Sequence, residues 1–140
     1  MLGAMTIPCV GAVIKDGAGR LLLIKRGHEP GAGLWSVPGG RVEAGETDEQ
    51  ALVREVLEET GLAVAPERLL GAVRRPGSNG SVLDIRDYTA VVTGGTLAAG
   101  DDAADARWVA AGEMAGLPLT SGLLDALTSW GVAQDRAAGL

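Results

Sequence analysis

Short apolar runs near the start of the chain predict β-strands. Residues 10–14 and 21–25 are mostly aliphatic, and residues 15–19 between them carry the Asp and Gly residues that favour a tight turn. Because the two runs have similar lengths and only a short connection, we expect them to pair as a hairpin.

A glycine-rich stretch follows these strands. Residues 27–33 predict a loop, and short strand pieces are expected at residues 34–37 and 41–43, on either side of a corner made by Pro38, Gly39 and Gly40. Glycine lets the backbone turn and approach another group closely. We therefore expect the corner to lie near whatever site the chain carries.

Residues 47–60 give the strongest helix prediction in the chain. Thr47 and Gln50 form the pattern of a capping box, no Gly or Pro interrupts the segment, and Gly61 suits the position just past a helix end. At about 100° per residue, one side of this helix is apolar and the opposite side is acidic. The apolar side carries Leu52, Val53, Val56 and Leu57, and the acidic side carries Glu55, Glu58 and Glu59.

The remaining pattern alternates sheet-forming and helical segments. Strands are predicted at residues 69–73, 82–92 and 107–109, and a closing helix at residues 119–130, with Leu123, Leu124 and Leu127 on one face. Helices separated by sheet-forming segments indicate an α/β (α+β) fold, an α/β/α layered arrangement with a mixed sheet. At 140 residues, we expect a single domain over residues 1–140 with one site.

The net charge of the chain limits the classes of ligand that it can be expected to bind. The formal net charge is −6, which argues against a surface that neutralises nucleic-acid backbones, so we expect no nucleic-acid partner. An acidic protein that binds a phosphorylated small molecule needs a cation to offset the repulsion, and a divalent metal is the natural choice.

Cysteine usage and hydropathy indicate the compartment. Cys9 is the only cysteine, so no internal disulfide can form, and its place in a predicted strand favours packing in the core. No segment has the length and hydropathy of a signal peptide or a membrane span. We therefore expect a cytoplasmic protein that does not associate with a membrane.

The acidic side of the predicted helix has two interpretations. Glu55, Glu58 and Glu59 are neighbours at spacings of three and four residues, and they crowd the end of the helix where the dipole disfavours anions. They could simply face water as a solvated surface. Alternatively, Mg²⁺ or Mn²⁺ relieves their repulsion, since these hard cations bind carboxylate oxygens together with water and phosphates.

Residues 40–62 favour the metal interpretation. Their sequence, GRVEAGETDEQALVREVLEETGL, matches the Nudix box G-x5-E-x7-R-E-U-x-E-E-x-G-U, in which U is aliphatic, at every defined position. The matched positions are Gly40, Glu46, Arg54, Glu55, Val56, Glu58, Glu59, Gly61 and Leu62. The chain thus resembles the Nudix hydrolases, especially small bacterial enzymes that act on ADP-ribose or nucleoside triphosphates. The resemblance implies an α/β/α sandwich and Mg²⁺-dependent hydrolysis of a diphosphate bond, with Mn²⁺ as a substitute.

The resemblance also implies a role for each part of the box. The carbonyl of Gly40 joins the metal shell, and Glu46 and Arg54 form a structural ion pair that ties the loop to the helix. The metal-binding and catalytic acids are Glu55, Glu58 and Glu59. The general base is one of these acids or an acid from a later loop.

A later acidic loop and several other residues are further candidates for the site. Either Asp101 or Asp102 could add a metal ligand, with Asp102 our candidate, or the pair could form a simple turn. Arg26 and Arg41 border the predicted site and could bind phosphates through charge-assisted hydrogen bonds.

Trp35 and His28 each have two roles open to them. Trp35 could stack on a base as a substrate-binding residue or pack in the core, and His28 could be an exposed loop residue or touch the substrate. Neither role follows from the sequence pattern alone.

The resemblance leaves the substrate open. Its first candidate is a nucleoside diphosphate derivative such as ADP-ribose or a related nucleotide sugar, and the second is a nucleoside triphosphate cleaved to release pyrophosphate. A non-catalytic nucleotide-binding module is the alternative from another class, while an isomerase on the same fold fits poorly with a single Cys9 and a single His28. Many Nudix hydrolases are dimers, so the resemblance makes a homodimer possible for this chain.

Overall fold

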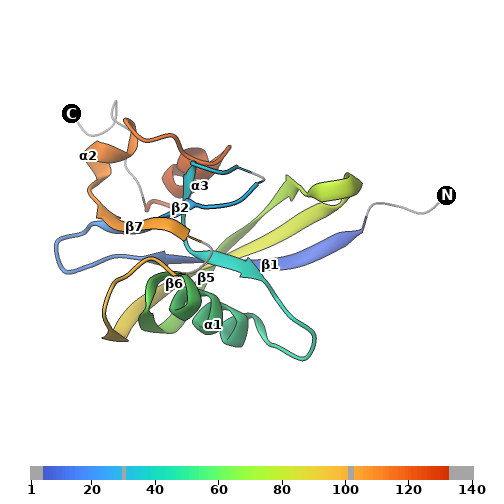
Figure 1. The fold of residues 1–140 in the computed structure, drawn as a ribbon, viewed down its shortest axis with the longest axis horizontal. Helices are drawn as coiled ribbons and strands as arrows, with labels where there is room; N and C mark the ends of the chain where they lie inside the picture. Colours follow the sequence, from blue (N-terminus) through green and yellow to red (C-terminus); the bar gives the residue numbers. More distant parts are fainter. Residues whose placement is uncertain (1–4, 30, 101–102, 133–140) are drawn as a thin grey trace.

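The computed structural model describes residues 5–29, 31–100 and 103–132, which form two β-sheets and three α-helices (Figure 1). The first sheet contains β1 (Thr6–Ile14), β4 (Gly39–Arg41), β5 (Leu62–Pro76) and β6 (Val82–Gly95). The second contains β2 (Leu21–Arg26), β3 (Trp35–Ser36) and β7 (Ala103–Val109). The helices are α1 (Asp48–Thr60), α2 (Ala111–Met114) and α3 (Leu123–Ser129), and a 3₁₀ turn, Ser78–Gly80, joins β5 to β6.

The first sheet is mixed, as the sequence predicted. Its strand order is β4-β1-β6-β5; β1 runs parallel to β6, and the other neighbours are antiparallel. The second sheet, β3-β2-β7, is antiparallel throughout. With α1 on one face and further helices on the other, the fold class expected from the sequence is confirmed.

The predicted pairing of the first two strands is wrong. The turn forms, because Asp16 accepts hydrogen bonds from the backbone N–H groups of Ala18 and Arg20 at 3.0 and 2.8 Å. Beyond one isolated bridge between Lys15 and Leu21, however, β1 and β2 belong to different sheets. Both strands are buried on both faces, so their apolar runs carry no information about which strand lies beside them.

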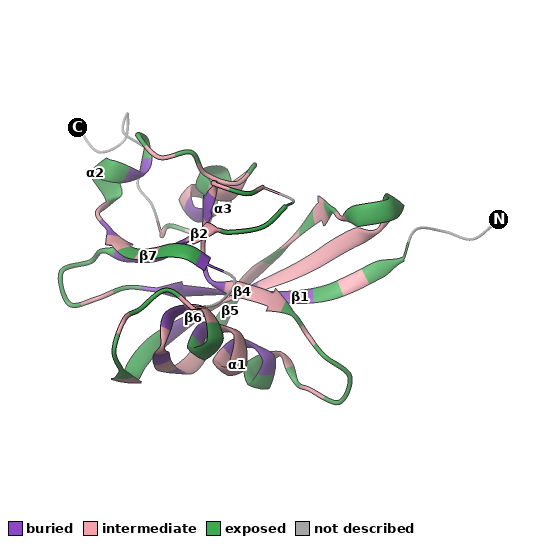
Figure 2. Cartoon of the chain, viewed as in Figure 1, coloured by how far each residue is buried: buried purple, intermediate pink, exposed green. Residues whose placement is uncertain are grey.

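The strands of both sheets lie between two hydrophobic cores, with α1 on one side and α2 and α3 on the other (Figure 1). β2 contributes Leu22 to the core at α1, and Leu21 and Leu23 to the other core. Val10, Ala12 and Ile14 of β1 pack against α1, whereas Val13 packs on the other side. Figure 2 shows that buried residues gather between the layers and that the outer side of α1 is exposed. Cys9 is 6% exposed, which confirms its place in the core.

The ends of α1 are those that the sequence predicted. Thr47 and Gln50 form both hydrogen bonds of the capping box, and Gly61 ends the helix with φ 74°, a conformation that favours glycine. One apolar assignment is wrong: Leu57 is 53% exposed, because Ala51, rather than Leu57, completes the buried side with Leu52 and Val56.

Other elements differ from the prediction mainly in length. The strand expected at residues 69–73 is the long β5, since it pairs along its length with β6, and the strand at 107–109 begins at Ala103. The closing helix begins at Leu123 rather than residue 119, because Leu119 bridges to Trp35 and Gly122 adopts a positive φ. Leu124 is partly exposed there, so it is not a core residue. None of the helices in the described ranges is long and apolar enough to cross a membrane.

Candidate active site

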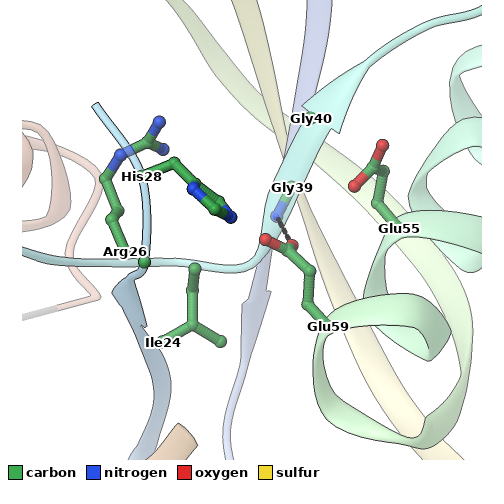
Figure 3. Close-up of a pocket in the computed structure, with 8 residues that line it drawn as sticks. Ile24, Arg26, His28, Gly39, Gly40, Glu55 and Glu59 are labelled. Carbon is green, nitrogen blue, oxygen red and sulfur yellow. Dashed lines mark hydrogen bonds between the residues drawn. The ribbon is translucent and has the colours of Figure 1, made fainter. Parts of the chain in front are cut away.

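The acidic side of α1 faces Gly39 and Gly40, which we call the glycine corner, although they form part of strand β4 rather than the turn predicted before a strand at residues 41–43. A methyl group at Gly40 would lie 2.5 Å from the carboxyl carbon of Glu55, so only glycine leaves room for this carboxylate beside the strand. One turn further along α1, Glu59 accepts a hydrogen bond from the backbone N–H of Gly39 at 2.8 Å (Figure 3). The corner and the helix thus hold two carboxylates next to one stretch of backbone.

Arg54 connects the loop before α1 to these acids. Its guanidinium donates two hydrogen bonds to the carboxylate of Glu46, at 2.7 and 2.9 Å, and one to the carbonyl of Arg41 at 3.0 Å. The two bonds from Arg54 to Glu46, together with one from the backbone N–H of Glu43, lower the pKa of Glu46 to about 2. The ion pair that the sequence predicted is present in this geometry.

The same guanidinium also reaches the neighbouring acids. Arg54 donates to Glu55 at 2.9 Å and to Glu58 at 3.3 Å. Burial nevertheless raises the pKa of Glu55, because the half-buried carboxylate loses more hydration than Arg54 offsets. Glu55 is therefore an anion short of compensating positive charge.

Glu58 shares Arg54 with Glu55 but is more exposed than Glu55. Its side chain is 57% exposed, pairs with Arg54 and does not line the pocket described next. The sequence grouped three carboxylates on one side of the helix, and the structure brings two of them to the glycine corner.

A pocket of about 260 Å³ opens in front of Glu55 and Glu59. The acids and the Gly39–Gly40 backbone form one wall; His28, in the loop after β2, points toward them from the other side, and Arg26, the last residue of β2, lies beyond His28 (Figure 3). The lining residues are Ile24, Arg26, Gly27, His28, Gly39, Gly40, Glu55 and Glu59. Carboxylates on one wall and a guanidinium on the other can hold a cation and an anion side by side.

Within the described residues, no three His, Cys, Asp or Glu side chains form a group arranged to hold a metal ion. Glu55 and Glu59 remain the pair of carboxylates that face the pocket. Asp101 and Asp102, the candidates for a later metal ligand, lie outside the described residues.

Two predicted substrate contacts do not line this pocket. Arg41 is exposed, and its backbone carbonyl is what contacts Arg54. Trp35 is 5% exposed in the core between the sheets, with the guanidinium carbon of Arg107 4.6 Å from its ring centre. Of the two roles open to Trp35, its burial agrees with packing in the core.

The sequence did not identify every residue at or near the site. Ile24 and Gly27 line the pocket and were not predicted to do so. His28, for which the sequence left two roles open, is exposed and also lines the pocket, because the path of the loop after β2 brings it there. An ionic cluster at the other end of α1 was also missed: Asp48 accepts hydrogen bonds from Arg86 and, at 2.7 Å, from Tyr88. This cluster fixes the start of α1 on β6, and the spacing of 38 residues between Asp48 and Arg86 leaves no local sequence signal.

Comparisons with known proteins agree with this architecture. A family model described as the NUDIX domain matches residues 5–127. The chain is 45% identical over 100 residues to an ADP-ribose pyrophosphatase of Methanocaldococcus jannaschii, covering 70% of this chain and 57% of that protein. It is 36% identical over 103 residues to a putative 8-oxo-dGTP diphosphatase of Bacillus subtilis, covering 73% and 65%.

A solved structure has the same fold. The crystal structure of a MutT protein from Methanosarcina mazei superposes with a TM-score of 0.82 at 24% identity, covering 94% of this chain and 96% of that one. The chain spans less than two thirds of the length of the two sequence relatives, but nearly the whole of this structural neighbour.

Proposed function

Since the chain belongs to the NUDIX domain family, we propose that it hydrolyses the diphosphate bond of a nucleoside diphosphate linked to another group, with a divalent cation as cofactor. One observation carries this proposal. Glu55 and Glu59 line the same pocket as Arg26 and His28, beside the Gly39–Gly40 backbone. Such a pocket suits a ligand that brings phosphate charge together with a cation.

The side chains at the pocket fit Mg²⁺, with Mn²⁺ as a substitute. Mg²⁺ is usually held by one or two carboxylates and completes its shell with water and substrate phosphates, so a pair of acids is enough. Gly40 leaves room for the Glu55 carboxylate beside the strand, and a cation bound to this half-buried carboxylate would offset the burial that raises its pKa. We assign Glu55 and Glu59 as ligands, with the Gly40 carbonyl, Glu58 and Asp102 as further candidates.

Each residue has a distinct role in the proposed reaction. When bound, the cation supplies charge neutralisation of the phosphates and activation of the attacking water. Arg26 holds a phosphate from the opposite wall, and Arg54 positions Glu55 while its pair with Glu46 fixes the loop. Water adds to one phosphorus and the bridging oxygen leaves with the other. Glu55, Glu58 and Glu59 are the candidates for the general base.

ADP-ribose or a related nucleotide sugar is our first candidate substrate. It is supported by the relative that is 45% identical and named ADP-ribose pyrophosphatase. A second candidate is a nucleoside triphosphate, supported by the relative named putative 8-oxo-dGTP diphosphatase. The first reaction gives two monophosphate products, and the second releases pyrophosphate.

A substrate panel tests this function. The wild-type chain is incubated with ADP-ribose, other nucleotide sugars, dinucleotides and nucleoside triphosphates in Mg²⁺ or Mn²⁺, and monophosphates and pyrophosphate are assayed separately. We expect metal-dependent hydrolysis of one class. Glu59→Gln should reduce it at least about a hundredfold, which corresponds to about 2.7 kcal/mol of transition-state stabilisation.

Glu49→Gln is the matched control. Glu49 lies in the first turn of the same helix and is exposed, so this variant should keep nearly full activity. Full activity of Glu59→Gln would contradict the proposed role of the pocket. If the panel gave no turnover while nucleotides still raised the melting temperature, a non-catalytic binding module would replace the enzyme.

A further inference from the structure

A row of glycines crosses the first sheet next to the pocket. The strand registers pair Gly39 of β4 with Gly11 of β1, Gly11 with Asp87 of β6, and Asp87 with Gly71 of β5. Asp87 therefore carries the single side chain in a row of four paired positions, which we call the glycine row. Gly39 lines the pocket and binds Glu59, so one end of the row is part of the proposed active site.

Asp87 lies on the face of the sheet opposite α1. Its neighbours Arg86 and Tyr88 both bond to Asp48 on α1, and side chains alternate along a strand. Asp87 thus points away from α1, to the face of the sheet on which the Trp130 ring packs against its paired residue Gly71.

The carboxylate of Asp87 is buried without a partner. The residue is 6% exposed, and its Oδ1 is the one buried side-chain oxygen or nitrogen among the described residues with no hydrogen bond. A methyl group at Gly11 would overlap Oδ1, so the carboxylate leans over Gly11, in the direction of Gly39. Buried polar groups nearly always have partners, and an exception points to a ligand or a function.

The pocket is open to solvent, so a bound nucleotide can extend beyond it. Its volume of about 260 Å³ lies below the range of about 300–1,000 Å³ typical of sites for small-molecule ligands. With strands about 4.8 Å apart, Asp87 lies about 10 Å from Gly39, a span comparable with the length of a nucleoside. A diphosphate held at Glu55 and Glu59 could therefore extend its nucleoside along the glycine row.

We propose that Asp87 is a specificity-determining residue whose carboxylate accepts hydrogen bonds from two adjacent donors on the nucleoside half of the substrate. The inference rests on the proposed function, which holds the diphosphate at the other end of the row. A carboxylate is an acceptor with two oxygens, so it matches a pair of donors. Such a pair occurs on the N1–H and N2–H edge of guanine and on the 2′ and 3′ hydroxyls of ribose.

Nucleoside monophosphates test this role apart from hydrolysis, because they contain no diphosphate bond. We would titrate the ¹⁵N-labelled full chain with GMP, dGMP, IMP and AMP in Mg²⁺ and follow the backbone N–H signals of Gly11 and Gly71. At least one nucleotide should shift both signals. Asp87→Asn should weaken its binding about tenfold or more, the effect expected for lost hydrogen bonds to a charged group.

The four probes distinguish the two sources of donors. Weaker binding of IMP than GMP, with dGMP unchanged, identifies the guanine edge. Weaker binding of dGMP, with IMP and AMP similar to GMP, identifies the ribose. Either pattern should disappear in Asp87→Asn, which a purely structural role would not cause.

Asp84→Asn is the matched control on the same strand. Asp84 pairs with Arg86 on the α1 side of the sheet, so its loss should not change nucleotide binding. The proposal is overturned if Asp87→Asn binds all four nucleotides as wild type does, if binding leaves Gly11 and Gly71 unshifted, or if wild type binds none of them. Hydrolysis that Asp87→Asn leaves unchanged would reject this inference alone, whereas Asp87-dependent binding without turnover would reject the enzyme proposal alone.

Discussion

A carboxylate with no hydrogen-bond partner is costly in a protein interior, and Asp87 carries one. Burial raises the pKa of Asp87 to about 6, although the field of Arg75 lowers it in part. Because the pKa of Asp87 in the folded chain exceeds that of an unfolded aspartate, protonation of Asp87 favours the folded state. This contribution to the free energy of unfolding is fully present only below about pH 4. It is lost as the pH rises through about 6.

Asp87→Asn should therefore stabilise the chain at neutral pH. The variant should be more stable than wild type at pH 7.5 by up to about 3 kcal/mol, and the difference should shrink steadily toward pH 4. Urea unfolding at several pH values measures this difference. Asp84→Asn removes the same charge but breaks a pair with Arg86, so it should give no such gain. If the difference in the free energy of unfolding between Asp87→Asn and wild type were the same at all pH values, the raised pKa of Asp87 would be contradicted.

The sequence placed candidate residues correctly at the pocket where a local pattern fixes their positions. Glu55 and Glu59 are on the pocket side of the helix because helical geometry places them there. Gly40 lies near the site as predicted, but in strand β4 rather than in a corner, because it pairs with Val10 of β1. The direction of Glu58 depends on Arg54, and the burial of Asp87 depends on a register between strands about 75 residues apart in sequence. No local pattern carries that register, so Asp87 was not predicted as a site residue.

At the scale of elements, α1 depends on two anchors that use the same chemistry at opposite ends. Arg86 holds the start of the helix through Asp48, and Arg54 holds the loop through Glu46. In each case, the arginine donates hydrogen bonds from two nitrogen atoms to one carboxylate. Lysine keeps the charge but cannot form this two-point contact.

Arg54→Lys should consequently lower activity while the helix remains formed. The variant loses the geometry that positions Glu55 beside Gly40, so kcat/KM should fall about tenfold or more. Circular dichroism checks the helix, and initial rates on the substrate from the panel check the activity.

Arg86→Lys is the matched comparison. It weakens an anchor of the same helix away from the pocket, so it should lower stability in urea while the folded enzyme keeps most of its activity. Equal losses of activity in both variants would mean that Arg54 acts only by stabilising α1.

The prediction of elements succeeded where the signals are local. The capping box and Gly61 define α1 because each bond of the caps joins residues close in sequence. The hairpin prediction failed because β1 pairs with β4 and β6, which come later in the chain, and not with β2. Leu124 and the start of α3 were misplaced for a similar reason, since the bridge between Leu119 and Trp35 determines where the last helix begins.

At the scale of the whole molecule, the pocket lies where the two layers meet. Arg26 belongs to the second sheet, while Glu55 and Glu59 belong to the helix packed on the first. A cation and phosphate bound between these walls would interact with both layers at once. Since unfolding destroys this arrangement, such binding should stabilise the entire fold rather than one segment.

Saturating Mg²⁺ should therefore raise the melting temperature, most strongly together with a monophosphate product. A cation at a hundred times its Kd adds about 2.7 kcal/mol, which is roughly 10 °C for a chain of this size. The increase should be lost in Glu59→Gln and kept in Glu49→Gln, even if the removal of like-charge repulsion alters the melting temperature without metal. Sodium chloride at matched ionic strength controls for general screening. An equal increase in Glu59→Gln would show that the cation binds elsewhere, and the pocket would then lose its assigned cofactor.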